Sequence, residues 1–381
     1  MSGDQYRRAS RRRYRQRRIL AGVVLLILVL FAVLLVRSCA TTPTAKTSGV
    51  GMASKQKDSS PARKPDKKTK RPAKKELPYK AIAPPAGATT SSTTMAETTS
   101  STTGGGTTMR ISPGSMLVGG ATDTTNGPLR HNRMVAFYGT PLSPQMGVLG
   151  QYGMKEMVSR LKQQTAAYSA ADPSHPAIPT IELIASVAQR TPGPSGQYIL
   201  QTPRNVIERY AKLAKDNGCL LLLDVQLGTA SVDQELKLLT PFLKLPYVHL
   251  AIDTEYHVAP GQVPGVNLGH VDASEIMGAS RSLTKLVEKN KLPPKVLVIH
   301  QFAEGIVTNK GQLQPTPHVE MVVNADGFGS PANKISKYNQ LVRNEAPQYG
   351  GFKLFYNQDI PLLGPKTVLN LQPAPAVVNY Q

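Results

Sequence analysis

The alternation of apolar and polar residues divides the chain into three parts. Residues 19–36 (ILAGVVLLILVLFAVLLV) form one apolar run without a charged side chain. Residues 37–108 show no apolar periodicity. From about residue 109 onward, short apolar runs alternate with stretches in which apolar residues recur every three or four positions. Short apolar runs are typical of β-strands, and apolar residues at every third or fourth position are typical of amphipathic helices. The third part therefore predicts a packed α/β domain.

Eight short apolar runs in this third part predict β-strands. They cover residues 133–139, 178–187, 219–226, 247–257, 295–302, 319–326, 352–357 and 376–380. Helical patterns lie between them, at residues 152–168, 203–217, 232–243, 271–290, 331–345 and 365–371. The helix at 203–217 is expected to end at Gly218, and the helix at 271–290 to begin at an N-cap formed by Asp272 or Ser274.

This order of elements predicts an α/β fold, a (β/α)8 TIM-type barrel over residues 109–381. Strands and crossovers alternate strictly, and the strand runs are nearly continuous in apolar residues, which is typical of strands covered on both faces. An open doubly wound sheet is the alternative. Neither GxGxxG nor GxxxxGK[ST] follows any of the strands, so the usual phosphate-binding loops are absent from the sequence.

The first part of the chain predicts a membrane anchor. As a helix, the run from Ile19 to Val36 would be roughly 27 Å long, close to the hydrocarbon thickness of a bilayer. Residues 1–18 hold eight Arg and are expected to be a basic cytoplasmic tail, which places the C-terminal domain outside the cytoplasm. A cleaved signal peptide, or cleavage followed by lipidation of Cys39, is the alternative.

Residues 37–108 predict a disordered linker between the anchor and the barrel. Residues 55–80 are rich in Lys, Arg and Pro, and 14 of the 20 residues at 89–108 are Ser or Thr. Neither composition can bury enough apolar surface to offset the entropy of ordering. The root-mean-square end-to-end distance of such a tether is about 45–50 Å. Its basic half is either a soluble spacer or a contact for anionic polymer or lipid headgroups, and its Ser/Thr-rich half could carry O-glycans.

Charge and cysteine content argue against several classes of protein. Residues 1–107 hold 21 Lys and Arg against 5 Asp and Glu, so most of the formal net charge of +21 lies outside the predicted barrel. This argues against a barrel that binds nucleic acid. Only Cys39 and Cys219 are present, which excludes a disulfide scaffold and a zinc module built from several cysteines. No cofactor is expected, and the sequence leaves the oligomeric state open.

Polar side chains at the carboxyl ends of the strands are the candidate site, because barrels of this type place their working residues there. The proposed substrate-binding residues, in chain order, are Tyr138, Glu182, Asp224, Gln226, His257, His300, Gln301, Asp326 and Tyr356.

The fourth predicted strand supplies the candidate catalytic pair. If residues 247–257 are one strand, its period of two places Asp253, Glu255 and His257 on one face. Two carboxyl groups so close disfavour each other's ionisation, so the pKa of one should rise above that of the other. The group with the higher pKa is then protonated near neutral pH and can act as an acid. We expect Glu255 to be that acid and Asp253 its charged partner. The alternative is that all three are loop residues beyond the rim of the barrel.

The residues Leu250-Ala251-Ile252-Asp253-Thr254-Glu255 resemble the end of the fourth-strand signature of family 18 chitinases, D-G-hydrophobic-D-hydrophobic-D-x-E. The resemblance implies a glycoside-hydrolase-like activity in which Glu255 is the acid/base and Asp253 steadies the N-acetyl group of the substrate. The expected function is therefore that of a membrane-anchored, extracytoplasmic barrel that acts on a glycan of the cell envelope or surroundings.

Two other functions stay open at this point. Ala251 replaces the middle Asp of the signature and the chain has no Trp, which favours a non-catalytic barrel that binds a polysaccharide or a partner protein. A metal-dependent hydrolase is the other alternative, with Asp224, Asp253, His300 and Asp326 as oxygen and nitrogen ligands.

Overall fold

The computed structural model describes residues 114–381 of the chain. The predicted basic tail, membrane helix and linker, together with Cys39, lie outside these residues. Across 114–381, no helix combines the length and the apolar character that crossing a bilayer requires.

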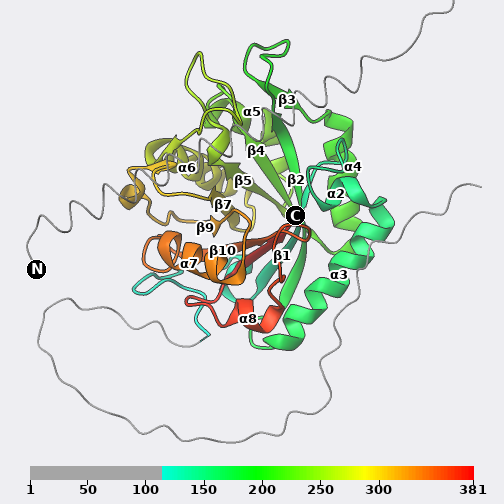
Figure 1. Cartoon of the computed structure of the whole chain (residues 1–381), viewed down its shortest axis with the longest axis vertical. Coiled ribbons are helices and arrows are strands. Elements are labelled where there is room, and N and C mark those ends of the chain that lie inside the picture. The colour runs from blue at the N-terminus through cyan, green and yellow to red at the C-terminus, as the bar shows by residue number, and fades with distance from the viewer. Residues whose placement is uncertain (1–113) are drawn as a thin grey trace, which may run out of the picture. The chain divides into compact units, whose positions relative to one another are not determined.

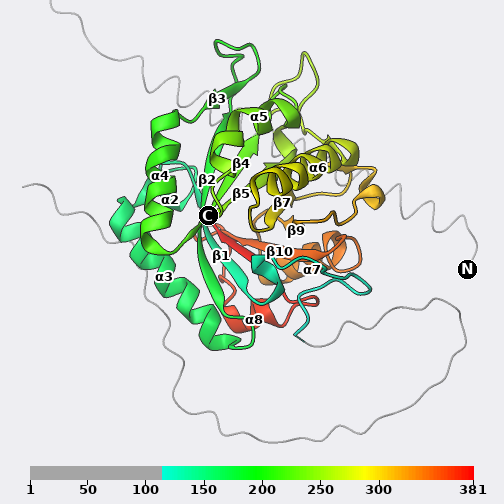
Figure 2. The same cartoon turned by 180° about the vertical axis from the view of Figure 1, so that it is seen from behind.

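Eight parallel strands form a closed barrel, which Figure 1 shows from one side and Figure 2 from behind. In chain order they are β1 (Arg133–Gly139), β2 (Ala177–Ala188), β4 (Leu220–Gln226), β5 (Val248–Asp253), β7 (Lys295–Gln301), β9 (Val319–Ala325), β10 (Tyr349–Leu354) and β11 (Val377–Tyr380). Strand β1 pairs with both β2 and β11, and this double pairing closes the ring. The TIM-type barrel is thereby confirmed, and the open sheet is wrong.

Helices surround the ring of strands (Figures 1 and 2). They are α2 (Val148–Gln151), α3 (Met154–Ala171), α4 (Arg204–Asn217), α5 (Val232–Leu243), α6 (Ala273–Asn290), α7 (Pro331–Leu341) and α8 (Pro365–Leu369). As expected, α4 ends at Gly218, whose φ of +65° lies in the left-handed region that glycine tolerates best. The Asp272 side chain caps α6 by accepting a hydrogen bond from the Ser274 amide.

Three short strands outside the ring were not predicted. Between β7 and β9, where the sequence predicts a short turn or helix, the chain forms β8 (Val307–Thr308) and the short 3-10 helix η3 (Lys310–Gln312). Strand β8 pairs with β6 (Val271–Asp272), which precedes α6. Strand β3 (Ile199–Gln201), which we did not predict, pairs antiparallel with the end of β2 and lengthens the wall of the barrel mouth.

The strand predicted over residues 247–257 is too long. β5 ends at Asp253, and Thr254–Tyr256 forms the 3-10 helix η2. The Thr254 hydroxyl donates a hydrogen bond to the carbonyl oxygen of His300, at 2.6 Å, which ties this turn to the neighbouring strand β7. The inference that Asp253, Glu255 and His257 share one strand face is therefore wrong.

The barrel strands separate two apolar regions. Outward side chains such as Val135, Leu223 and Ile299 pack against the helices in one large cluster, which also buries Cys219 as expected of a core thiol. Inward side chains in the amino-terminal half of the barrel, such as Met134 and Leu222, form a second cluster. The carboxyl-terminal half of the interior contains mostly polar side chains instead.

A short 3-10 helix, η1 (Pro128–Arg130), lies at the amino-terminal end of the barrel. The backbone amides of Leu129 and Arg130 donate hydrogen bonds to the buried carboxyl of Glu320 on β9, at 3.0–3.2 Å. The apolar half of the interior is thus capped at its amino-terminal end.

Candidate active site

A ring of buried polar side chains fills the carboxyl-terminal half of the barrel. Each of the eight barrel strands contributes one of them, at a position where the alternation of the strand turns the side chain inward. In chain order these residues are Tyr138, Glu182, Asp224, Asp253, His300, Asn324, Lys353 and Asn379. We call this set the polar ring. Gln226 at the end of β4 and Asp326, directly after β9, lie at its edge.

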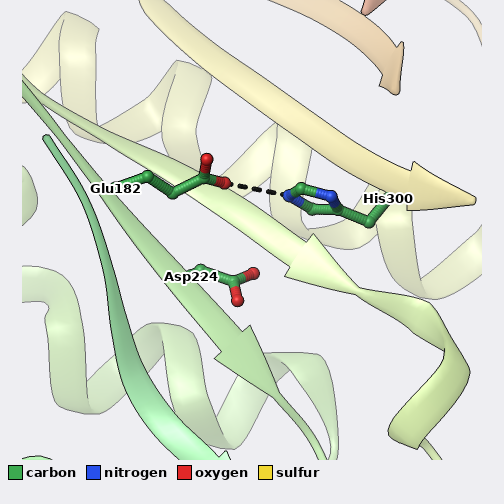
Figure 3. A group of neighbouring side chains, drawn as sticks. All are labelled: Glu182, Asp224 and His300. Atoms are coloured by element: carbon green, nitrogen blue, oxygen red, sulfur yellow. Dashed lines mark hydrogen bonds and ion pairs between the residues drawn. The ribbon is translucent and has the colours of Figure 1, made fainter. Parts of the chain in front are cut away.

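His300 joins two carboxylates within the polar ring. Its Nε2 lies 2.9 Å from Oε1 of Glu182, and its Nδ1 lies 3.2 Å from Oδ2 of Asp326 (the Glu182 bond is drawn in Figure 3). Asn379 donates a hydrogen bond to the other carboxylate oxygen of Glu182. Although burial disfavours the imidazolium ion, the charges of Glu182 and Asp326 raise the pKa of His300 well above its usual value. The two carboxylate contacts therefore favour the imidazolium form of His300.

Lys353 is the second buried cation, and it determines the charge of Asp326. Its Nζ lies 2.8 Å from Oδ2 of Asp326 and 3.8 Å from the ring centroid of Tyr138. Burial by itself would raise the pKa of Asp326, but Lys353 and His300 outweigh it and hold that pKa well below its usual range. Asp326 is thus a carboxylate that stays ionised.

For Asp224 and Asp253, the factors that raise the pKa outweigh those that lower it. Burial raises the pKa of both groups; the Asp253 charge raises that of Asp224 further, and the Asp326 charge adds to that of Asp253. The Tyr138 hydroxyl donates to Oδ2 of Asp224 at 3.3 Å, and the Gln226 amide donates to Oδ2 of Asp253 at 3.2 Å. The charges of His300 and Lys353 lower both pKa values, but burial outweighs them.

A cavity of about 380 Å³ opens above the polar ring, at the carboxyl ends of the strands. Glu255, on the turn η2, contributes a carboxyl group to its wall. Burial, followed by the charges of Asp253 and Asp326, raises the pKa of Glu255 to about 8. At neutral pH Glu255 therefore carries a proton, and it faces the same cavity as the ionised Asp326.

Aromatic and amide groups complete the cavity wall. Phe328 is 66% exposed and contacts Phe355 edge to face, with ring centroids 5.9 Å apart. The full lining is Tyr138, Gln145, Met146, Ile184, Gln226, Asp253, Glu255, Tyr256, Phe302, Asp326, Gly327, Phe328, Lys353, Phe355, Gln358 and Gln381. Exposed ring faces beside amide donors and acceptors suit a ligand that has both apolar faces and hydroxyl groups.

The structure gathers most of the predicted site residues. Tyr138, Gln226, Asp253, Glu255 and Asp326 line the cavity. Three more belong to the polar ring beneath it, namely Glu182, Asp224 and His300.

Three predicted residues lie elsewhere. His257 is turned away, with Nδ1 3.0 Å from the carbonyl oxygen of His270, because η2 ends the alternation of the strand before it. Gln301 is buried, and its amide donates to the carbonyl oxygen of Ala303. Tyr356 stacks on Tyr380, with ring centroids 5.0 Å apart, outside the strands. The structure thus places these three residues outside the lining of the cavity.

Sequence reasoning missed three members of the polar ring, Asn324, Lys353 and Asn379. Each is a polar residue within an otherwise apolar run, in VEMVVNAD, FKLFYN and AVVNY. Each also lies two positions after an inward residue of its strand, so counting by twos along each strand would have found it.

One group in the polar ring has the composition of a metal site. Glu182, Asp224 and His300 each offer a ligand atom, and these atoms lie within 4.8 Å of one another (Figure 3). Asp253 and Asp326, which the sequence suggested as further ligands, are not members of this group within the described part of the chain.

Comparison with known proteins gives no relative for this chain: no family matches it, and no curated protein matches it. The resemblance of residues 250–255 to family 18 chitinases thus finds no support in either comparison. The fold is a TIM-type barrel, and its candidate site is the cavity at the carboxyl ends of the strands.

Proposed function

We propose that the barrel is a glycoside-hydrolase-like enzyme in which Glu255 is the general acid and Asp326 is the ionised carboxylate. One observation carries this proposal: two carboxyl groups line one cavity, and their pKa values are shifted in opposite directions. Pairs of carboxyl groups separated in this way typically divide the acid and base roles of a hydrolase between them.

The proposed chemistry follows from these protonation states. Protonated Glu255 donates its proton to the glycosidic oxygen, so that the leaving sugar departs as an alcohol. Ionised Asp326 stabilises the positive charge that develops on the remaining sugar ring. Water then adds to that ring and gives one proton to the Glu255 carboxylate, which restores the acid. Asp253 contributes indirectly, because its charge helps to raise the pKa of Glu255. In this assignment Asp326 takes the charged role that the sequence suggested for Asp253.

The cavity wall supports a carbohydrate as the substrate class. Phe328, which is 66% exposed, provides aromatic surface for the apolar face of a pyranose ring, and Gln145 and Gln358 provide amide groups for hydroxyls. The acid and its ionised partner lie beside this wall, where a glycosidic bond would have to be held.

The proposed location is the outer side of a cell membrane. Its support is the composition of residues 1–108: a basic tail, an apolar run at 19–36 and a long polar stretch. Alkaline phosphatase, which folds only outside the cytoplasm, should be active when fused after residue 381 and should lose that activity when residues 19–36 are deleted. An active fusion without residues 19–36 would contradict the proposed anchor.

The direct test is cleavage of soluble polysaccharides by the full-length chain and its variants. Glu255→Gln keeps the size of the side chain but removes the transferable proton, so kcat/KM should fall by roughly 10²–10⁴-fold. Asp326→Asn should give a loss of similar size. The matched control is Glu288→Gln, on the exposed carboxyl-terminal end of α6, which should leave the rate unchanged.

Equal rates for wild type and Glu255→Gln would overturn this proposal. Polysaccharide binding without cleavage by the wild type would favour the non-catalytic alternative instead. Thermal unfolding of each variant, followed by circular dichroism, separates a lost proton donor from a lost fold.

A further inference from the structure

Glu182, Asp224 and His300 converge from β2, β4 and β7 in the layer directly beneath the cavity. None of the three lines the cavity, and the acid/base chemistry proposed above assigns none of them a direct part. The geometry points to this trio as a binding site for one divalent metal ion of the Mn²⁺ or Zn²⁺ class.

The spacing of the ligand atoms fits a single ion. Bonds from such an ion to nitrogen and oxygen are about 2.0–2.2 Å long, which places adjacent ligand atoms about 3 Å apart and opposite ones about 4.2–4.4 Å apart. His300 Nε2 and Glu182 Oε1 are 2.9 Å apart, and the three ligand atoms all lie within 4.8 Å of one another. An ion that enters between them needs only small movements of the side chains.

A second, independent observation is an unpartnered oxygen. Asp224 is completely buried, and its Oδ1 has no hydrogen-bond partner. Figure 3 shows the Asp224 carboxylate beside the hydrogen-bonded Glu182–His300 pair, with no interaction drawn to either residue. A buried carboxylate oxygen without a donor is costly, and a bound cation would satisfy it.

Each of the three candidate ligands also forms a polar contact with a further residue. His300 presents Nδ1 to Asp326, Asn379 donates to Glu182, and Tyr138 donates to Oδ2 of Asp224. Metal-binding histidines and carboxylates in proteins usually have such outer partners, which fix the orientation of the ligand. The trio is therefore oriented before any ion arrives.

The charges around the trio favour a dication. Four carboxyl groups are buried in and beside the polar ring, on Glu182, Asp224, Asp253 and Asp326, against two cationic side chains, His300 and Lys353. Binding through Nε2 requires the neutral form of His300, so the ion displaces the imidazolium proton and takes its place as the positive charge beside these carboxyl groups. One imidazole nitrogen beside carboxylate oxygens suits Mn²⁺ or Zn²⁺ better than Ca²⁺ or Mg²⁺, which favour oxygen alone.

The test is calorimetric titration of the chelator-treated full-length chain with MnCl₂ and with ZnCl₂. We expect one equivalent of one of these ions to bind and to raise the unfolding temperature. Asp224→Asn removes one charged ligand and should weaken binding by at least tenfold. The matched control Asp216→Asn, on the exposed side of α4, should bind as the wild type does.

X-ray absorption of the loaded chain provides a second measurement, with nitrogen and oxygen neighbours expected at about 2.0–2.2 Å. His300→Asn should lose the imidazole contribution from that spectrum. Circular dichroism of both variants without metal shows whether they fold, so that weak binding is not mistaken for unfolding.

Absence of stoichiometric binding of both ions would overturn this inference, as would equal affinity in Asp224→Asn, or binding of Ca²⁺ or Mg²⁺ alone. These outcomes are separate from the test of Glu255. Cleavage that depends on Glu255 in a chain that binds no metal would overturn only the metal site. Metal binding in a chain indifferent to Glu255→Gln would overturn only the proposed acid.

Discussion

Glu255 and Asp326 line the same cavity, yet their environments push them toward opposite protonation states. Lys353 lies 2.8 Å from Asp326 and holds its pKa low, whereas burial raises the pKa of Glu255 to about 8. Lys353 also lowers the pKa of Glu255, although burial and the neighbouring acids outweigh it. A single lysine therefore influences both members of the proposed catalytic pair, and its effect can be measured as a function of pH.

The proposed roles of the pair predict the pH profile of cleavage. Because Glu255 acts as an acid only while protonated, kcat/KM should fall above about pH 8, tenfold for each further pH unit. Lys353→Met removes a charge that lowers the pKa of Glu255, so the falling limb should move to higher pH. In the same variant the pKa of Asp326 should rise, which adds a loss of rate at low pH.

The control for this measurement is Lys289→Met, in the exposed last turn of α6, which should keep the wild-type profile. A falling limb that stays in place in Lys353→Met, or moves to lower pH, would contradict the electrostatic account of Glu255.

At the scale of elements, local sequence signals set most helix and strand boundaries. The predicted and observed limits agree for β1 and α5, and Ser231 with Gln234 forms a capping box at the start of α5. Three predicted boundaries are wrong. The strand predicted over 352–357 lies at Tyr349–Leu354, and the helix predicted over 331–345 ends at Leu341. The strand predicted over 247–257 is too long, because the strand-like sequence pattern continues into Thr254-Glu255-Tyr256. A hydrogen bond from Thr254 to the neighbouring strand accompanies the turn there, and an apolar pattern contains no information about such a partner.

The short helix η1 provides a prediction about stability at this scale. A Cβ on Gly127 would lie 2.3 Å from the Glu320 carboxyl carbon, so Gly127→Ala must displace the group that accepts hydrogen bonds from Leu129 and Arg130. We expect a loss of about 2–3 kcal/mol in the free energy of unfolding. Urea denaturation measures it.

Gly311→Ala is the matched control, because a Cβ there meets no atom within 4 Å. It should change the free energy of unfolding by less than about 0.5 kcal/mol. Similar losses in the two variants would show that Glu320 does not hold η1 at the end of the barrel.

For the molecule as a whole, closure of the barrel depends on β1, which pairs with β2 on one side and β11 on the other. Arg133 at the start of β1 is fully buried at this seam. Its Nε donates to the carbonyl oxygen of Pro375, directly before β11 begins, and its Nη1 contacts Asp172 at the end of α3. One side chain thus ties together segments 242 positions apart in the sequence.

Arg133→Met should destabilise the fold by about 2–4 kcal/mol, because it leaves the Pro375 carbonyl oxygen and Asp172 without their buried partner. Arg204→Met, at an exposed ion pair with Glu208, should cost less than about 1 kcal/mol. Equal effects, measured by thermal or urea unfolding, would remove Arg133 from the account of barrel closure.

The fold class, and the end of the barrel at which polar side chains gather, follow from the residue pattern alone. Regular alternation of apolar runs and helical patterns is a local property, and the carboxyl ends of the strands follow from it once the ring is closed. Asp253, Glu255 and Asp326 could therefore be placed at the mouth from the residues alone.

Which of these groups meet, and how each shifts the pKa of its neighbours, depends on the closed ring of strands. Lys353 and Asp326 come from different strands, and so do Glu182, Asp224 and His300. Their pKa values depend on burial and on distances of about 3 Å between side chains far apart in the chain. Such distances arise only when the ring closes. The residues alone therefore suggested Glu255 as the protonated acid, whereas the low pKa of Asp326 follows only from its contacts with Lys353 and His300.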